Sequence, residues 1–237
     1  MKMLKRWRTT VLSFIGTCRK RTAVRPSDNA IAVVLKQYQV KTFWQNKIGE
    51  VLSAYVLSSG RAPGNIMAEA YYEQGDAAII WVIERWSNEA FYKMNSKSAA
   101  AKMVNGLAEL GLAELVEIVF LEDLEGISRE APRDDDQPLT IMLLADLKAG
   151  TEDRFRSINQ EMISAFRKES GLLVFTLSRM VHHKTRFVIY KKFRNLNAFQ
   201  HHLKDPAVQP VLEFLQTAVK EPPFEKGYHH LIQLAPL

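Results

Sequence analysis

The hydrophobic pattern of the first half of the chain predicts a βαββαβ unit. Apolar residues alternate along short runs, as in half-buried strands, and elsewhere recur every three or four residues, as on one face of a helix. Between two apolar runs, Glu73-Gln74-Gly75-Asp76 predicts a hairpin turn. The predicted strands are residues 30–36, 66–72, 77–86 and 115–121, and the predicted helices are a segment ending near Gly60, residues 88–94 and residues 99–110.

The same order of elements begins again at Leu139. Strands are predicted at 139–147, 172–181, 186–193 and 228–234, and helices at 152–166, 196–203 and 208–219. Gly64 and Trp86 are 22 residues apart, and so are Gly171 and Phe193, about 107 residues further along the chain. We interpret this agreement as the duplication of one unit.

Charge and composition divide the chain further. The first 25 residues contain eight Lys or Arg and no acidic residue, whereas the remainder has 24 basic and 26 acidic residues. The segment before Leu139 contains Asp134-Asp135-Asp136 and two prolines, a composition that disfavours a packed core. We therefore predict a basic tail at 1–29, a first domain at 30–126, an acidic linker at 127–138 and a second domain at 139–237.

This charge distribution argues against nucleic-acid binding, because the part of the chain after the tail is slightly acidic and lacks a clustered basic face. The apolar run at 11–15 is too short for a membrane span, which takes about 20 residues, and the basic residues after it do not fit a signal peptide. We expect a cytoplasmic protein without stable membrane insertion. Peripheral membrane contact by the basic tail and lipid modification of Cys18, the one cysteine, stay open.

A duplicated βαββαβ unit has a physical rationale. Each unit covers one face of its sheet with its own helices and leaves the other face open. A second copy can cover that face, and fusion makes the pairing intramolecular. We predict an α+β fold with tandem ferredoxin-like units packed sheet to sheet as a pseudo-dimer within one chain, and further homodimerisation stays open. Small ligands would bind between each sheet and its two helices.

Short motifs in both halves resemble one family. The first half contains Gly64-Asn65 and Glu84-Arg85-Trp86-Ser87-Asn88-Glu89-Ala90-Phe91, and the second contains Glu169-Ser170-Gly171, Tyr190-Lys191-Lys192-Phe193-Arg194-Asn195 and Ala198-Phe199-Gln200-His201-His202. These motifs resemble the antibiotic biosynthesis monooxygenase domain, a family that includes quinol monooxygenases and belongs to the dimeric α/β-barrel superfamily. The resemblance covers residues 30–125 and 139–235 and implies an intramolecular dimeric α/β barrel.

The resemblance also implies a catalytic base. In the family, a histidine on the short helix after the third strand faces the pocket, and His202 stands at that position. A neutral imidazole can take a proton from a phenol or hydroquinone, and the resulting anion is electron-rich enough to react with O2 without metal or flavin. The alternative is that His202 only caps or packs its helix. The first half has Met94 or Asn95 at this place, and neither is a base.

Further residues are candidates for substrate binding. Glu84 and Trp86 share one face of a predicted strand, where a carboxylate beside an indole either acts as a desolvated base or packs on the sheet. The remaining candidates are Arg179, Tyr190 and Tyr228 as polar groups of the pocket or its rim, and Phe193 as an aromatic wall.

No metal or cofactor is expected. The six histidines form three adjacent pairs in the second half, but adjacent residues of a strand face opposite sides, so each pair offers at most one ligand to a common site. The Trp and His of the heme-degrading relatives would fall at His202 and near Leu212, which does not match. The sequence also lacks a phosphate-binding glycine loop, a dinucleotide fingerprint and a nucleophile elbow.

Two hypotheses for function follow. The first is a cofactor-independent monooxygenase that oxidises a small aromatic quinol, anthrone or phenol with O2 and uses His202 as base. The second is a non-catalytic protein on the same fold that binds a small ligand or is associated with stress.

Overall fold

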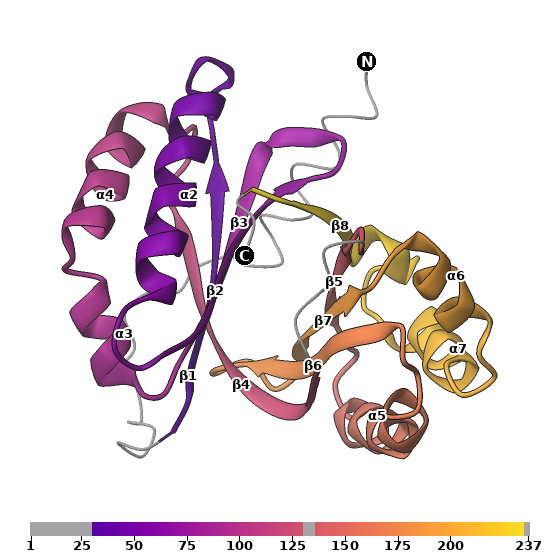
Figure 1. Cartoon of the computed structure of the whole chain (residues 1–237). Helices are drawn as coiled ribbons and strands as arrows, with labels where there is room; N and C mark the ends of the chain where they lie inside the picture. Colours follow the sequence, from indigo (N-terminus) through magenta and orange to yellow (C-terminus); the bar gives the residue numbers. More distant parts are fainter. Residues whose placement is uncertain (1–29, 130–135, 235–237) are drawn as a thin grey trace. The chain divides into compact units, whose positions relative to one another are not determined.

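The computed structural model describes residues 30–129 and 136–234 (Figure 1). Its contacts divide the described chain into two compact units. The first unit contains the residues up to Phe120 and the segment from Gln233 onwards, and the second is Leu121–Ile232. The predicted basic tail and residues 130–135 of the predicted linker lie outside the described residues.

The first unit is a sheet with helices on one face. Its elements are β1 (Ala32–Gln39), η1 (Thr42–Trp44), α2 (Gln45–Gly60), β2 (Asn65–Glu73), β3 (Asp76–Trp86), α3 (Glu89–Asn95), α4 (Ala99–Gly111) and β4 (Glu117–Ser128), which continues into the second unit. Strand β3 pairs antiparallel with both β1 and β2. Ile48 and Leu52 of α2 belong to the same buried cluster as Ile80 and Val82 of β3, so the apolar stripe of the helix meets the inner face of the sheet.

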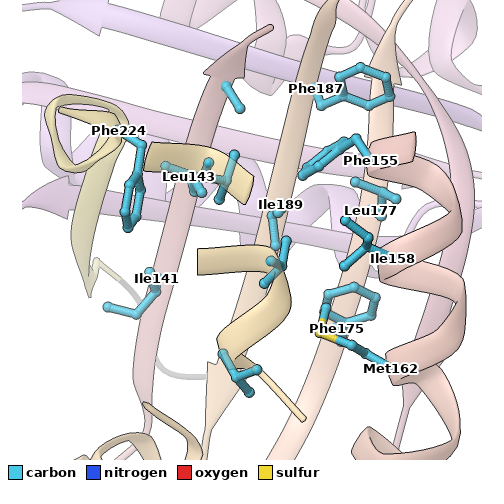
Figure 2. Close-up of a cluster of buried hydrophobic side chains, with 14 of the residues drawn as sticks. Ile141, Leu143, Phe155, Ile158, Met162, Phe175, Leu177, Phe187, Ile189 and Phe224 are labelled. Carbon is cyan, nitrogen blue, oxygen red and sulfur yellow. The ribbon is translucent and has the colours of Figure 1, made fainter. Parts of the chain in front are cut away.

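The second unit repeats this plan. Its elements are β5 (Leu139–Asp146), α5 (Glu152–Phe166), β6 (Leu172–Met180), β7 (Arg186–Phe193), α6 (Leu196–Lys204), α7 (Gln209–Ala218), η2 (Phe224–Gly227) and β8 (Tyr228–Gln233). Antiparallel pairing gives the strand order β8-β5-β7-β6, which is that of a ferredoxin-like unit. Figure 2 shows α5 laying Phe155, Ile158 and Met162 against apolar side chains of the sheet.

Equivalent backbone contacts in the two units confirm the duplication. Asn88 caps α3 by accepting from the Phe91 N–H at 3.1 Å, and Asn195 caps α6 by accepting from the Ala198 N–H at 2.9 Å. The two caps are 107 residues apart and need no gap. The same offset joins Asn95 to His202, which decides between Met94 and Asn95 as the counterpart of the histidine.

Two glycines at this offset allow a close approach of strand and helix. A Cβ on Gly64 would overlap the Phe91 ring, and Gly64 has a positive φ of 75°. A Cβ on Gly171 would lie 2.6 Å from the Cβ of Ala198. Each glycine therefore lets the capped helix that follows the third strand of its unit lie directly against the start of the second strand.

The predicted α+β class with tandem ferredoxin-like units is confirmed, and most predicted element ends lie within three residues of the observed ones. The exception is β4, which was expected to end at Leu121 but continues to Ser128. Residues 121–128 pair with β6. Half of these residues are exposed and three are acidic, so their composition resembles a linker more than a strand.

Candidate active site

The candidate base, His202, lies on α6 behind its Asn195 cap. Its side chain is fully buried, as is most of Phe199 three residues earlier, whereas His201 is exposed. This difference agrees with the 100° rotation between successive helical residues. The imidazole lies between the rings of Phe166 and Phe193, with both ring centroids 5.0 Å away.

Two charged side chains contact the two ring nitrogens of His202. Glu169, in the turn after α5, places Oε2 2.8 Å from Nδ1, and Lys191 of β7 places Nζ 2.7 Å from Nε2. A carboxylate only accepts, so Nδ1 carries the proton and donates it to Glu169. Nε2 is then the acceptor for the Lys191 amine. The three groups form a buried chain in which one negative charge offsets one positive charge.

Burial and mutual repulsion shape the titration of this chain. Burial lowers the pKa of His202, the Lys191 charge lowers it further, and the hydrogen bond that Nδ1 donates to Glu169 opposes both, so the imidazole is neutral at pH 7. Burial also lowers the pKa of Lys191 to about 8, against the attraction of Glu169. The Lys191 Nζ lies 5.1 Å from the Phe166 ring centroid, and this contact partly offsets its desolvation.

A small cavity lies between the sheet of the second unit and its helices α6 and α7. It is lined by Ile141, Leu143, Ile189, Lys191, Leu203, Val208, Val211, Leu212, Leu215 and Tyr228. Lys191 and Tyr228 are the polar members of this set. The free space is about 20 Å³, room for about one water molecule. An aromatic ring therefore enters only when lining side chains move apart.

The other residues singled out in the second half have different positions. Phe193 packs against His202, and Tyr228 lines the cavity, where burial raises its pKa to about 12. Tyr190 is buried but precedes Lys191 on β7, so it faces the opposite side of the sheet. Arg179 is about one-third exposed and pairs with Glu122 at 2.6 Å, which places it outside the cavity.

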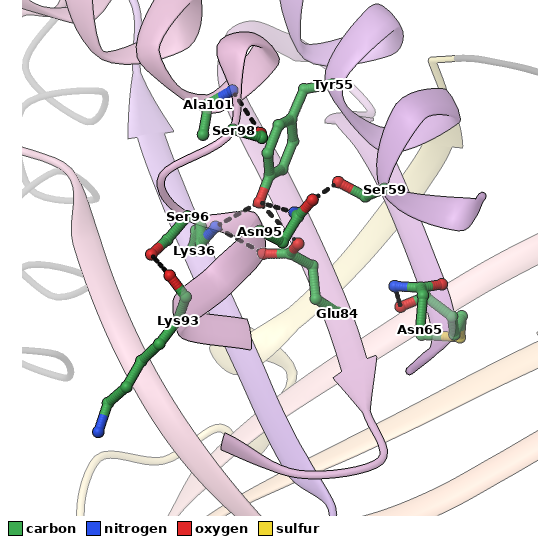
Figure 3. A network of polar contacts seen from close by, with 11 residues as sticks. Lys36, Tyr55, Ser59, Asn65, Glu84, Lys93, Asn95, Ser96, Ser98 and Ala101 are labelled. Atoms are coloured by element: carbon green, nitrogen blue, oxygen red, sulfur yellow. Dashed lines mark hydrogen bonds and ion pairs between the residues drawn. The ribbon is translucent and has the colours of Figure 1, made fainter. Parts of the chain in front are cut away.

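The first unit has a polar centre at the equivalent place (Figure 3). Glu84 of β3 stands 107 residues before Lys191 and is fully buried. Its Oε2 lies 2.5 Å from the Lys36 Nζ, and its Oε1 accepts from the Tyr55 hydroxyl at 2.8 Å. Asn95 donates to the hydroxyls of Tyr55 and Ser59, at 3.2 and 2.9 Å.

The polar side chains of this centre are paired with one another. Burial raises the pKa of Tyr55 well above its usual value, and the Glu84 charge raises it further, so the phenol stays protonated. Glu84 is held by an ammonium and a phenol, and the position of His202 is taken by an amide. Trp86 is also fully buried on the Glu84 face of β3, packed with Ala32, Val34 and Tyr92. The arrangement compensates buried charge but offers no available base.

Two members of the His202 chain were not identified as site residues from the sequence. Lys191 was noted as the counterpart of Glu84, and Glu169 was part of a motif. A signal for Lys191 existed, because Phe187, Ile189 and Phe193 alternate with it on the buried face of β7. A lysine within such a row faces the helices. Glu169 lies in a turn, where no periodicity indicates the direction of a side chain.

Among the described residues, no group of three or more His, Cys, Asp and Glu side chains is placed to hold a metal ion. No helix in the described ranges combines the length and apolar character needed to cross a membrane.

The chain was compared with known families, curated proteins and solved structures. Residues 138–213 match the family model for antibiotic biosynthesis monooxygenase. No curated protein matches the chain. Two solved structures named "putative monooxygenase", from Lactobacillus acidophilus NCFM and Fusobacterium nucleatum, give TM-scores of 0.73 and 0.77. Both are 12% identical over 86% of this chain and 94% and 93% of their own.

An anthrone oxidase-like protein gives a TM-score of 0.60 at 9% identity, over 87% of this chain and 92% of its own. At these identities the likeness shows the fold. Together with the match over residues 138–213, it confirms the resemblance drawn from the sequence motifs: the second unit is similar to the antibiotic biosynthesis monooxygenase domain.

Proposed function

We propose that the second unit is a monooxygenase that oxidises a small aromatic quinol, anthrone or phenol with O2 and needs no bound cofactor. The observation that carries this proposal is the Lys191–His202–Glu169 chain, whose lysine lines an otherwise largely apolar cavity. The family of the domain and the names of its structural neighbours support the reaction class.

The buried chain provides a proton acceptor. His202 does not line the cavity, and its Nε2 is occupied by Lys191, so the lysine is the group that meets the substrate. Unprotonated Lys191 takes the proton of a ring hydroxyl or of an activated CH2 group. His202 and Glu169 then stabilise the new ammonium through the Nε2 lone pair and the carboxylate charge. His202 thus acts through Lys191 as a positioning residue.

The anion formed in this way is the electron donor for O2. For an anthrone-like CH2 group, one oxygen atom enters as a carbonyl and the other leaves as water, with no further reductant. The aliphatic cavity wall would hold the ring and keep bulk water away from the anion, whereas Phe193 packs behind it against His202. Tyr228 is proposed to contact a second oxygen of the substrate. The other sequence candidates, Glu84, Trp86, Arg179 and Tyr190, have no role in this scheme.

Oxygen consumption with a panel of reduced quinones and anthrones tests the proposal. We expect His202→Gln and Lys191→Met each to lower turnover by about 100-fold or more, the usual contribution of general acid–base catalysis. His201→Ala, on the exposed side of the same helix, is the matched control and should keep full activity. Circular dichroism checks that each variant is folded. Unchanged turnover in His202→Gln would exclude the assigned chain.

The same assay gives a pH profile. The reactive form needs unprotonated Lys191, so kcat/KM should rise about tenfold per pH unit and level off above about pH 8. The groups that face the lysine and His202 are Glu169, Asp205 and Tyr228, and of these Tyr228 titrates only near pH 12. A flat profile from pH 6 to 9 contradicts Lys191 as the proton acceptor.

The alternative function is a non-catalytic protein that binds a small ligand. Two observations favour it: the cavity has room for about one water molecule, and the equivalent place in the first unit has no histidine. Absence of turnover by the unmutated chain across the whole panel, together with saturable binding of the same compounds, would establish this reading. A cytoplasmic location and the absence of a membrane or nucleic-acid partner stay predictions.

A further inference from the structure

The Lys191 amine is placed as a nucleophile as well as a base. Its side chain is more than nine-tenths buried and lines the cavity. Its hydrogen-bond partner is a neutral imidazole rather than a carboxylate. The amine therefore has a proton acceptor within 2.7 Å and apolar space on its other side. Lysines desolvated in this way are the ones that add to carbonyl groups.

A second buried lysine in the same chain shows the contrast. Lys36 has a similar exposure, but its Nζ forms an ion pair with Glu84 and contacts the Tyr55 hydroxyl at 3.2 Å. The Lys36 Nζ is thus held between a carboxylate and a phenol, whereas the Lys191 Nζ contacts a neutral imidazole. Burial alone is therefore shared by the two lysines, whereas the neutral partner and the cavity distinguish Lys191.

We propose that Lys191 forms a Schiff base with a small apolar aldehyde or ketone bound in the cavity of the second unit. His202 Nε2 first takes a proton from the Lys191 ammonium. The free amine adds to the carbonyl carbon, and a proton then moves from the amine nitrogen to the former carbonyl oxygen to give a neutral carbinolamine. The imidazolium then protonates the departing hydroxyl, which leaves as water, so the products are a protonated imine and a neutral imidazole.

The sum is one ammonium group and one carbonyl compound giving one protonated imine and one water, without oxidation or reduction. This reaction uses the same cavity as the proposed oxygenase but needs neither O2 nor a phenolic substrate. The experimental result for one activity therefore does not decide the other. The apolar wall of Ile141, Leu143 and Ile189 favours an uncharged aliphatic or aromatic carbonyl compound over a sugar or keto acid.

Reductive trapping in anaerobic buffer tests the inference on the full unmutated chain. Butanal or benzaldehyde with cyanoborohydride converts an imine into a stable secondary amine, and peptide mass spectrometry locates it. We expect Lys191 to be alkylated at least about tenfold faster at pH 7 than an exposed lysine, because more of it is unprotonated. Lys36 is the matched buried control, and Lys47 is the exposed one.

Two variants sharpen the result. Lys191→Arg keeps a cation against His202 but cannot form an imine, so the preferred site of labelling should disappear while exposed lysines react as before. His202→Gln should slow labelling of Lys191 without affecting Lys47. The comparison of lysines within the unmutated chain does not depend on either variant folding. Labelling of Lys191 at or below the rate of Lys36 or Lys47 would overturn the inference, whatever the oxygen assay shows.

Discussion

At the scale of single residues, the two units neutralise a buried charge in different ways. Position 84 holds a carboxylate and position 191 an ammonium, at equivalent places on β3 and β7. In the first unit the opposite charge comes from the neighbouring strand through Lys36. In the second unit it comes from Glu169 with His202 in between. The imidazole is what separates the second pair of charges and leaves the amine able to react.

Removing the charge of Glu84 tests how tightly the first centre is coupled. Glu84→Gln leaves the Lys36 ammonium buried without its ion-pair partner, so we expect a loss of about 3–5 kcal/mol in the free energy of unfolding. Trp44, Trp81 and Trp86 lie in the first unit, and the fourth tryptophan, Trp7, belongs to the predicted tail, so the change in tryptophan fluorescence in urea reports on this unit.

The exposed Lys47–Glu50 pair supplies the control for this experiment. Its side chains are 61% and 68% exposed, and Glu50→Gln should change stability by less than about 0.5 kcal/mol. Equal effects of Glu84→Gln and Glu50→Gln would show that Glu84 is not the partner on which the centre depends.

At the scale of elements, the capped helix after the third strand positions His202 in the second unit and Asn95 in the first. The Asn cap sets where each helix begins, and the glycine at the start of the second strand lets the helix approach. Gly171 meets Ala198, and Gly64 meets Phe91. The same arrangement of a capped helix against a glycine therefore positions His202 in the second unit and the Asn95 amide in the first.

Gly171→Ala tests this close approach. The added Cβ would lie 2.6 Å from the Ala198 Cβ, so α6 must shift, and we expect a loss of about 1–3 kcal/mol measured by circular dichroism in urea. Adding Ala198→Gly removes the colliding atom and should restore part of the loss, less about 1 kcal/mol for a glycine in a helix.

A third glycine gives the matched control. Gly106 of α4 has no atom within 4 Å of an added Cβ, and Gly106→Ala should be neutral or stabilising by up to about 1 kcal/mol. If Ala198→Gly gives no rescue in the Gly171→Ala background, the collision is not the cause of the loss.

At the scale of the whole molecule, the strand β4 decides where the units divide. Its residues from Leu121 onwards pair with β6, so the chain has already entered the second unit before the acidic segment. The added strand covers an edge of β6 that a ferredoxin-like unit alone leaves unpaired.

Hydrogen exchange followed by mass spectrometry tests this division. Backbone amides between Glu125 and Arg129 should exchange slowly, because Gly126, Ile127 and Ser128 pair with β6 and the Arg129 N–H donates to Leu173 at 2.9 Å. The exposed turn at Gly75 serves as the fast reference within the same chain. Exchange of residues 125–129 as fast as this turn would support a linker beginning at 127, as the composition predicted.

The amino-acid sequence by itself determined the order of elements and the duplication, and the family resemblance singled out His202. The elements could be predicted because alternation, helical spacing and turn residues depend on neighbours a few residues away. The repeat distance of 107 residues could be recognised because Gly64 and Trp86 are as far apart as Gly171 and Phe193.

Only the tertiary structure decided which groups meet. Lys191 and His202 are on a strand and a helix, and Glu169 is 33 residues before the histidine, so their contact depends on how α6 packs against β7. The same holds for the pairing of β4, because its residues from Leu121 onwards are partly exposed and rich in acids and show no clear hydrophobic alternation. Contacts between distant segments arise from packing and desolvation. The sequence pattern indicates which residues are buried, but it does not indicate which distant residue each of them contacts.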